Sequence, residues 1–211
     1  MYVWRDRTMM NPASGTASVR IVDEFDLARA QEYALLATLL TRSPDTQVLH
    51  RLSALHGDAS PMGVAHMALA NAARRTNEQA ASREFFALFA GLGKGALLPY
   101  ASHYLSDTLY GRPLARLRET LEGLGLEKAP ERTEPEDHAG FLCEVMAGLA
   151  GGSILAPAVA ERLFFDQHVS RWMRRFFVDL ERASSADFYA AVGALGRTFI
   201  EIEAKAFALP G

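Results

Sequence analysis

The fold is indicated most directly by residues 133–149, whose sequence is TEPEDHAGFLCEVMAGL. Thr133 and Glu136 have the spacing of a capping box, which predicts that a helix begins at this point. The residues that follow repeat with the period of one helix face, and the predicted core positions are Phe141, Leu142, Val145, Met146 and Leu149. Gly151 and Gly152 predict the end of this helix.

The same helical period continues on both sides of this stretch. Asp23 and Thr76 are predicted to cap two helices on the N-terminal side, and Ser60 with Pro61 is predicted to begin a third. On the C-terminal side, one continuous helix is predicted from about Pro157, and its predicted core residues are Phe165, Val169, Trp172, Phe176 and Leu180. A last helix follows, and its predicted core residues are Phe188, Val192, Leu195, Phe199 and Ile202. No segment shows sustained alternation with a period of two, so the sequence predicts an all-α helical bundle of about eight or more helices.

A charged, proline-containing stretch divides the chain. Residues 127–133 have the sequence EKAPERT, and we expect a hinge there. This hinge would join an N-terminal helical lobe, residues 23–126, to a C-terminal helical lobe, residues 134–211, with the two lobes forming one compact unit. Residues 1–22 contain no apolar run typical of a secretory signal, so we interpret them as a flexible leader.

Composition excludes several classes of protein. Of the 211 residues, 49% are apolar and 22% are charged, which is typical of a globular protein rather than a disordered one. The formal net charge of -3 argues against a dedicated nucleic-acid binder, and no apolar run approaches the roughly 20 residues that cross a bilayer. The single cysteine, Cys143, excludes an internal disulfide and a multi-cysteine metal site. We therefore expect a soluble protein of the cytoplasm.

The common catalytic and metal-binding motifs do not occur in the sequence. The stretch GLGKGA at residues 91–96 resembles a dinucleotide-binding turn, but it follows a predicted helix where that motif requires a strand. The chain has no Glu-x-x-His pair for a di-metal site and no Gly-x-Ser-x-Gly nucleophile elbow. We therefore expect no catalytic residues, no bound metal and no cofactor.

The most unusual local chemistry is an acid-rich segment at the predicted helix start. Glu134, Asp137 and His138 lie there, where acidic residues also offset the helix dipole. Asp137, Phe141 and Glu144 follow one another at i, i+4 and i+7, so the predicted helix places them on one face. Carboxylates beside an aromatic surface could hold an arginine, whose guanidinium pairs with a carboxylate through two hydrogen bonds. Helix capping and guest binding are both open readings of this segment.

Two aromatic segments lie outside this helix. Tyr100 and Tyr104 are four residues apart, which would place two rings with polar tips on one face, as in recognition surfaces and also in protein cores. Aromatic residues between Phe164 and Phe177 recur at helical spacing, and we interpret them as mainly core. Cys143 is interpreted as a small core residue rather than a nucleophile.

These segments, in this order, resemble the TorD/DmsD-type family of redox-enzyme maturation chaperones. Glu134, Pro135, Asp137 and His138 are similar to the family's Glu-Pro-x-Asp-His hallmark. The resemblance extends over about residues 23–208, and it also rests on Phe85, Phe86, Phe89, Gly91, Leu98, Pro99, Tyr100, Ser102, Tyr104, Leu105, Gly111, Pro113, Leu114, His168, Trp172, Phe188 and Tyr189.

The resemblance implies an all-helical cytoplasmic protein without catalytic activity. Family members bind precursors of molybdenum-cofactor oxidoreductases before export, through the twin-arginine signal peptide and the body of the precursor. Some members exchange lobes, so the resemblance implies a monomer or a lobe-exchanged homodimer. Together with the helix-face argument, it predicts a signal-peptide site made of Glu134, Asp137, His138, Glu144, Tyr100, Tyr104 and Phe141.

Two finer points follow from the same residues. The glycine-rich stretch 91–95, the Leu-Pro-Tyr segment 98–100 and the Phe-Leu-Cys-Glu segment 141–144 are most similar to members that serve formate dehydrogenases. If Asp137 grips the peptide, its replacement by alanine should weaken binding with little change in thermal midpoint, whereas a capping role predicts a large loss of stability.

Two other functions are alternatives to the chaperone. One is an all-α enzyme or small-ligand-binding protein that uses His138 and the nearby carboxylates. The other is a helical transcription regulator, which would need a basic recognition helix, and the acidic balance of the chain counts against it.

Overall fold

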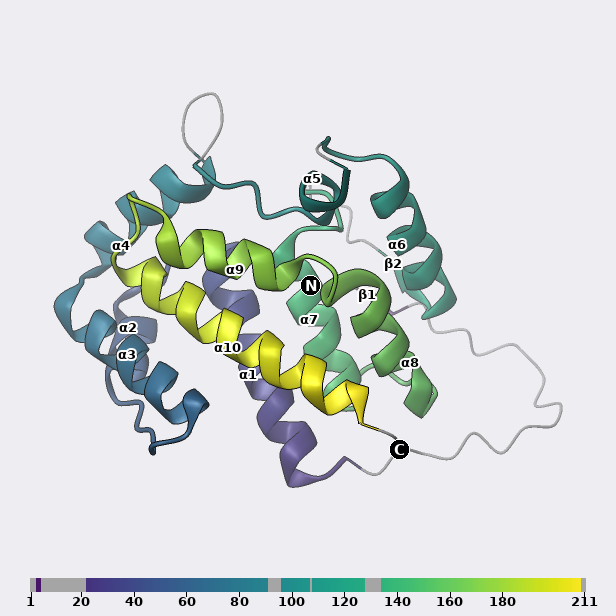
Figure 1. Cartoon of the computed structure of the whole chain (residues 1–211), viewed down its shortest axis with the longest axis horizontal. Helices are drawn as coiled ribbons and strands as arrows, with labels where there is room; N and C mark the ends of the chain where they lie inside the picture. The colour runs from purple at the N-terminus through teal and green to yellow at the C-terminus, as the bar shows by residue number, and fades with distance from the viewer. Residues whose placement is uncertain (1–2, 5–21, 91–95, 107, 128–133, 210–211) are drawn as a thin grey trace, which may run out of the picture.

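A computed structural model describes residues 3–4, 22–90, 96–106, 108–127 and 134–209. Over these residues the chain forms ten α-helices, two short π-helical segments and one two-stranded antiparallel sheet, so the prediction of an all-α fold is confirmed (Figure 1). Predictions for the glycine-rich stretch 91–95, for hinge residues 128–133 and for nearly all of the leader lie outside the described residues.

The elements in chain order are β1 (Val3–Trp4), α1 (Glu24–Thr41), α2 (Thr46–Ser53), α3 (Pro61–Arg75), α4 (Glu78–Phe85), the π segment η1 (Phe86–Ala90), α5 (Ala101–Ser106), α6 (Arg112–Gly123), β2 (Leu126–Glu127), α7 (Ala139–Ala150), α8 (Ala158–Phe164), the π segment η2 (Phe165–Val169), α9 (Met173–Arg182) and α10 (Phe188–Ala208). Across the part of the chain that is described, no helix is both long and apolar enough to cross a membrane.

Helix α1 packs along α7 at the centre of the molecule, and α10 packs against both α9 and α3. Figure 1 shows α2, α3 and α4 at one end and α5, α6 and α8 at the other. One hydrophobic core joins them, and it takes residues from both predicted lobes, including Leu36 and Leu40 of α1, Phe141 and Met146 of α7, and Phe176 of α9. This core is consistent with one compact unit, and the division into two lobes stays a prediction.

Two of the predicted helix starts are confirmed and one is displaced. The Asp23 side chain accepts a hydrogen bond from the Asp26 backbone N–H (2.8 Å), and Ser60 caps α3 with Pro61 as its first residue. Thr76 does not cap α4, because Asn77 does so, and its side chain accepts from a backbone N–H one turn into the helix. Local spacing therefore located these starts to within one residue.

The prediction that a helix begins near Thr133 is wrong, since α7 begins at Ala139 and its N-cap is His138. The His138 Nδ1 accepts a hydrogen bond from the Gly140 backbone N–H (3.1 Å). Backbone hydrogen bonds tie the residues around His138 to a distant segment, from Ala101 N–H to Asp137 O (2.9 Å) and from Ala139 N–H to Pro99 O (2.7 Å), and they form an antiparallel bridge between Tyr100 and His138. These long-range bonds occupy the backbone groups that an earlier helix would have used.

The predicted continuous helix after Pro157 is divided into α8, η2 and α9, with Trp172 as the N-cap of α9. The indole N–H of Trp172 donates to the backbone carbonyl of His168 (2.7 Å), which stabilises the turn between the segments. The residues predicted to form the core of this stretch are all buried. On α10, however, Ile202 is 38% exposed, contrary to the prediction, because Glu203 takes the inward position in that turn.

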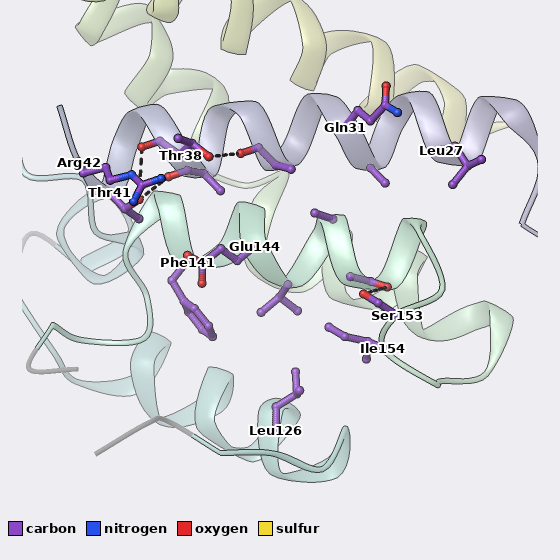
Figure 2. Close-up of a pocket in the computed structure, with 16 residues that line it drawn as sticks. Leu27, Gln31, Thr38, Thr41, Arg42, Leu126, Phe141, Glu144, Ser153 and Ile154 are labelled. Carbon is purple, nitrogen blue, oxygen red and sulfur yellow. Dashed lines mark hydrogen bonds between the residues drawn. The ribbon is translucent and has the colours of Figure 1, made fainter. Parts of the chain in front are cut away.

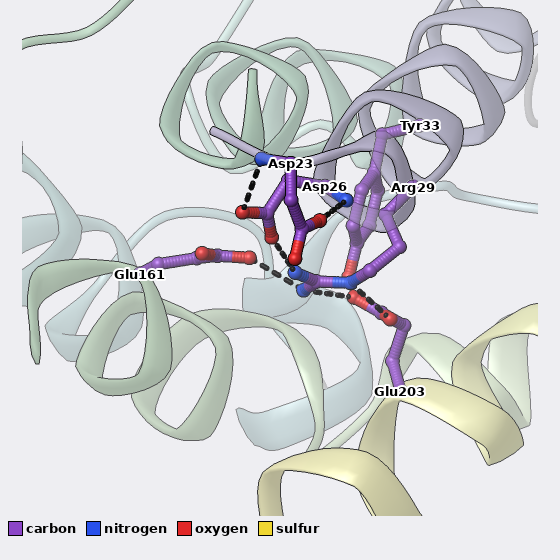
Figure 3. Close-up of polar contacts among 6 residues, drawn as sticks. All are labelled: Asp23, Asp26, Arg29, Tyr33, Glu161 and Glu203. Atoms are coloured by element: carbon purple, nitrogen blue, oxygen red, sulfur yellow. Dashed lines mark hydrogen bonds and ion pairs between the residues drawn. The ribbon is translucent and has the colours of Figure 1, made fainter. Parts of the chain in front are cut away.

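A polar cluster connects that end of α10 to α1 and α8 (Figure 3). The Arg29 guanidinium donates to both oxygens of Glu203 (2.7 Å each) and to a Glu161 oxygen, and its third nitrogen lies 3.2 Å from an Asp26 oxygen. The Tyr33 hydroxyl also donates to Glu203 (2.9 Å). Burial alone would lower the pKa of Arg29, but the hydrogen bonds and charge of Glu203 raise it above its usual value. The cluster therefore holds a permanent cation among buried carboxylates.

Candidate functional site

The acid-rich segment 134–138 meets the segment before α5 and forms one wall of a small pocket. The Tyr100 hydroxyl donates a hydrogen bond to Glu134 (3.0 Å), and the Tyr100 ring lies edge-to-face against the His138 ring with centroids 5.3 Å apart. The Glu134 side chain is 63% exposed, and its Oε2 lies 3.9 Å from His138 Nε2. Burial and the negative charge of Glu134 raise the pKa of Tyr100, so the hydroxyl stays protonated and acts as a donor.

This hollow, which we call the acidic pocket, has a volume of about 240 Å³. Its apolar wall is aromatic and aliphatic, and its lining comprises Leu40, Thr41, Phe85, Phe89, Ala90, Pro99, Tyr100, Glu134, Pro135, Glu136, His138 and Phe141. Glu136 is paired with Arg118, whose two nitrogens donate to the two carboxylate oxygens at 3.1 and 2.8 Å. Glu134 is the more exposed of the two carboxylates, because the Glu136 side chain is only 9% exposed. Glu134 is therefore the carboxylate that solvent or a guest can reach.

A larger groove of about 870 Å³ runs between α1 and α7, and we call it the α1–α7 groove (Figure 2). Figure 2 shows Thr41, Arg42 and Glu144 toward one end, and Leu27, Ser153 and Ile154 toward the other. Three small residues contribute to its α1 wall: Ala30, Ala34 and Ala37. The groove is therefore polar toward one end and mainly apolar along its length.

The acidic pocket and the groove adjoin, because Thr41 and Phe141 line both of them. Gly140 permits this junction, since a Cβ at that position would lie 2.6 Å from Thr41 Cγ2 and 3.3 Å from the Ala37 carbonyl oxygen. The absence of a side chain at Gly140 thus lets α7 approach α1 closely where the two hollows meet. The result is one surface with a carboxylate at one end and an apolar channel beyond it.

Asp137 faces away from the acidic pocket. It is fully buried, and its Oδ2 accepts a hydrogen bond from the Ser102 backbone N–H (2.8 Å) near the start of α5. Its other oxygen, Oδ1, has no hydrogen-bond partner among the described residues. Asp137 therefore positions the hallmark segment against α5, and nothing in this geometry brings its carboxylate to a guest in the acidic pocket.

Tyr104 also lies apart from the acidic pocket. Its hydroxyl donates to Asp179 (3.0 Å), its ring packs on Trp172 with centroids 5.4 Å apart, and the Arg175 guanidinium lies 5.4 Å from the ring centroid. The helical interpretation of Tyr100 and Tyr104 as one face fails because Tyr100 precedes α5, which begins at Ala101. Of the predicted site residues, the structure brings together Tyr100, Glu134, His138 and Phe141, with Glu144 in the adjoining groove.

Sequence reasoning missed the contribution of α1 to this surface. Thr41, Arg42 and the three alanines of the groove wall are not among the predicted site residues, although small residues at 30, 34 and 37 recur at helical spacing. Such spacing indicates a helix face that allows another helix to approach closely, and it is the sequence signal from which this wall could have been predicted. The interpretation of Cys143 as core is confirmed, since it is buried and burial raises the pKa of its thiol. Among the residues described, no three His, Cys, Asp or Glu side chains gather as a metal site would require.

Comparisons with known proteins agree with this architecture. Residues 55–178 match the family described as the nitrate reductase delta subunit. The chaperone protein TorD of Shewanella pealeana is 23% identical over 218 residues, which cover 93% of this chain and 97% of that protein. TorD of Aliivibrio salmonicida is 29% identical over 134 residues, and there the match covers 59% of this chain and 62% of the relative.

A DmsD chaperone and a solved structure are also similar to this chain. The Tat proofreading chaperone DmsD of Haemophilus influenzae is 28% identical over 120 residues, covering 56% of this chain and 57% of that protein. A crystal structure described as a candidate redox enzyme maturation protein from Archaeoglobus fulgidus shares the fold, with a TM-score of 0.54 at 18% identity over 87% of this chain and 98% of that one.

Proposed function

The chain belongs to the nitrate reductase delta subunit family, and on that premise we propose that it is a chaperone that binds the precursor of a molybdenum-cofactor oxidoreductase through its twin-arginine signal peptide. Its relatives are named chaperones, which supports the role of a chaperone over that of an enzyme. The proposed role is to hold the precursor while it folds and receives its cofactor before export.

One observation carries this proposal: the acidic pocket opens onto an apolar groove at Thr41 and Phe141. A twin-arginine signal peptide has the same two chemical parts in sequence, a basic region and then an apolar region. An arginine at Glu134 would pair with a carboxylate that is 63% exposed, and its guanidinium could form two hydrogen bonds there. The apolar region would then lie along the α1–α7 groove, in the manner of a helix in a hydrophobic groove.

The predicted site residues divide into two roles under this proposal. Glu134, Tyr100, His138 and Phe141 contact the basic part of the peptide, and Glu144 contacts it from the groove. Asp137 is a positioning residue, because its carboxylate is buried beneath α5. Contacts with exposed carboxylates contribute roughly 0–1 kcal/mol each, which suits a chaperone that must release its client.

Titration calorimetry with a synthetic twin-arginine signal peptide tests the basic end of the site. We expect the peptide to bind at least about fivefold more tightly than a variant with two lysines, because the lysine ammonium cannot form the paired hydrogen bonds of a guanidinium. Equal affinity for the two peptides, or binding of neither, would refute the proposal.

The apolar end has its own variant. Ala34 is exposed on α1 and lines the groove, so Ala34→Phe would fill the groove without entering the core. We expect this change to lower the affinity for the signal peptide by about tenfold. The control Ala115→Phe, at an exposed position on α6 outside the groove, should leave that affinity unchanged. Equal effects of the two substitutions would place the apolar part of the peptide elsewhere.

The finer part of the proposal concerns the client and the assembly. We infer that the client is a formate dehydrogenase and that binding takes place in the cytoplasm, with the chaperone as a monomer or a lobe-exchanged homodimer. Affinity purification of the full chain from its native host, followed by mass spectrometry and light scattering, tests all three points. Recovery of a different oxidoreductase with a twin-arginine leader would correct the client and leave the chaperone role in place.

A further inference from the structure

A third hollow lies on the other side of the hallmark segment and has no part in the peptide site. Its volume is about 430 Å³, and α5, α6 and the region of η2 line it. Asp137 forms part of its lining, and Glu134 and His138 line the acidic pocket instead. The hallmark segment therefore separates two hollows, and the third has its own chemistry. We call it the arginine-rimmed pocket, after Arg112, Arg116 and Arg171, which line it.

The three rim arginines are exposed, and none of their guanidinium groups has an ion pair or a hydrogen bond within the described part of the chain. Arg118, on the same helix, differs because it is engaged by Glu136 at 2.8 Å. Two carboxylates, Glu119 and Asp137, also line the pocket, so the three arginines exceed them by one positive charge. The rim thus has an excess of positive charge, and its guanidinium groups can form paired hydrogen bonds with the oxygens of an anion.

The interior of the pocket is polar and uncharged on its histidine side. His168 Nε2 is hydrogen-bonded to the Thr120 hydroxyl (2.9 Å), and burial lowers the pKa of His168 to about 4, so the ring is neutral near pH 7. Asp137, which is fully buried, lines the same pocket, and its Oδ1 has no hydrogen-bond donor among the described residues. Buried polar atoms are seldom left without a partner, so this oxygen calls for a donor from a guest.

We propose that the arginine-rimmed pocket binds a small organic phosphate that carries a hydroxyl or N–H group. The phosphate oxygens pair with the rim guanidinium groups, and the donor of the organic part reaches Asp137 Oδ1. The volume falls within the range of small-molecule pockets, roughly 300–1,000 Å³. An acidic peptide also carries carboxylates and backbone N–H donors, so its binding is an outcome that the test distinguishes.

Calorimetry with ribose 5-phosphate, inorganic phosphate and ribose tests this site in the full chain. Ribose 5-phosphate supplies both the oxyanion and the hydroxyl donors, so we expect it to bind about tenfold more tightly than inorganic phosphate, and ribose to show no binding. The double substitution Arg116→Gln with Arg171→Gln should lower the affinity for ribose 5-phosphate by at least about tenfold. Removal of one positive charge outside the pocket, in the variant Arg75→Gln at the exposed end of α3, should have no effect.

Asp137→Asn tests the interior. An asparagine keeps an oxygen for the Ser102 N–H but presents an N–H₂ group where an acceptor stood, so the preference for ribose 5-phosphate over inorganic phosphate should disappear. Circular dichroism checks that this variant is folded, and the exposed arginines test the site independently if it is not.

Several outcomes would overturn the proposal. They are equal binding of ribose 5-phosphate and inorganic phosphate, binding that the rim substitutions do not change, and binding of a tetraglutamate peptide at the arginines with no binding of either phosphate. The site is independent of the proposed peptide site, because the rim substitutions should leave affinity for the twin-arginine peptide unchanged. Failure of one proposal is therefore distinguishable from failure of the other.

Discussion

Two carboxylates of this chain, Glu203 and Glu134, have opposite surroundings. The Glu203 side chain is 2% exposed and bonds to Arg29 and Tyr33, while the Glu134 side chain is 63% exposed and has Tyr100 at 3.0 Å. A buried charge must keep its partner, because no water can replace it, but an exposed carboxylate can exchange one partner for another at little cost. Similar chemistry therefore stabilises the fold in the first region and leaves a site available to a guest in the second.

The largest effect is expected from removing the cation of the buried region. Arg29→Met leaves Glu203 and Glu161 buried without their shared partner, and we expect the free energy of unfolding to fall by about 3 kcal/mol in urea denaturation. Arg174→Met is the matched control, because Arg174 is 58% exposed and pairs with Glu201 at the surface, so its loss should cost under about 1 kcal/mol. A similar cost for both variants would remove the distinction between buried and exposed pairs.

Asp137 belongs with the buried region although the hallmark places it beside Glu134. Asp137→Ala removes the acceptor of the Ser102 N–H and should lower the free energy of unfolding by about 2 kcal/mol, with a lower thermal midpoint. This reverses the expectation from sequence that a peptide-gripping Asp137 would leave stability unchanged. An unchanged midpoint with weaker peptide binding would restore that expectation.

Glu84 lies between the two extremes, since it is half-buried. Its carboxylate accepts from the backbone N–H groups of Asp187, Phe188 and Tyr189 at 2.7, 3.1 and 2.6 Å, and thereby caps α10 from α4. Glu84→Ala should cost about 1 kcal/mol, as the loss of other helix caps does. Chemical denaturation measures this loss of unfolding free energy. A loss equal to that of Arg29→Met would show that helix capping, and not burial of charge, determines the size of these effects.

The smallest effect on stability is expected at Glu134. Glu134→Gln should change the free energy of unfolding by under about 0.5 kcal/mol, because the side chain is mostly exposed. The same substitution should still lower the affinity for the twin-arginine peptide by about fivefold. Glu122→Gln, on the exposed face of α6, is the control for the loss of one negative charge. A stability loss as large as that of Asp137→Ala would assign Glu134 to the fold.

The sequence predicted the elements whose boundaries depend on nearby residues. Asp23 and Ser60 were placed correctly because each cap bonds to a backbone N–H three residues away. The core positions of α7 and α9 were predicted from their spacing for the same reason. The start of α7 was misplaced because hydrogen bonds between residues 99–101 and 137–139 override the local capping pattern. The division into α8, η2 and α9 has no comparable clue in the spacing of apolar residues.

The candidate site was predicted in part. Four predicted residues line the same pocket: Tyr100, Glu134, His138 and Phe141. Tyr104 instead donates a hydrogen bond to Asp179, and Asp137 accepts one from the Ser102 backbone N–H. The contribution of α1 was missed, since nothing in residues 133–149 indicates which helix will pack beside them.

The sequence alone thus determined the all-α class, most of the helices and their buried faces, because helical period and capping act over a few residues. Only the tertiary structure decided which carboxylates are buried and which are exposed. That outcome depends on contacts between residues far apart in the chain, such as Arg29 with Glu203 and Ser102 with Asp137, and no local pattern encodes them.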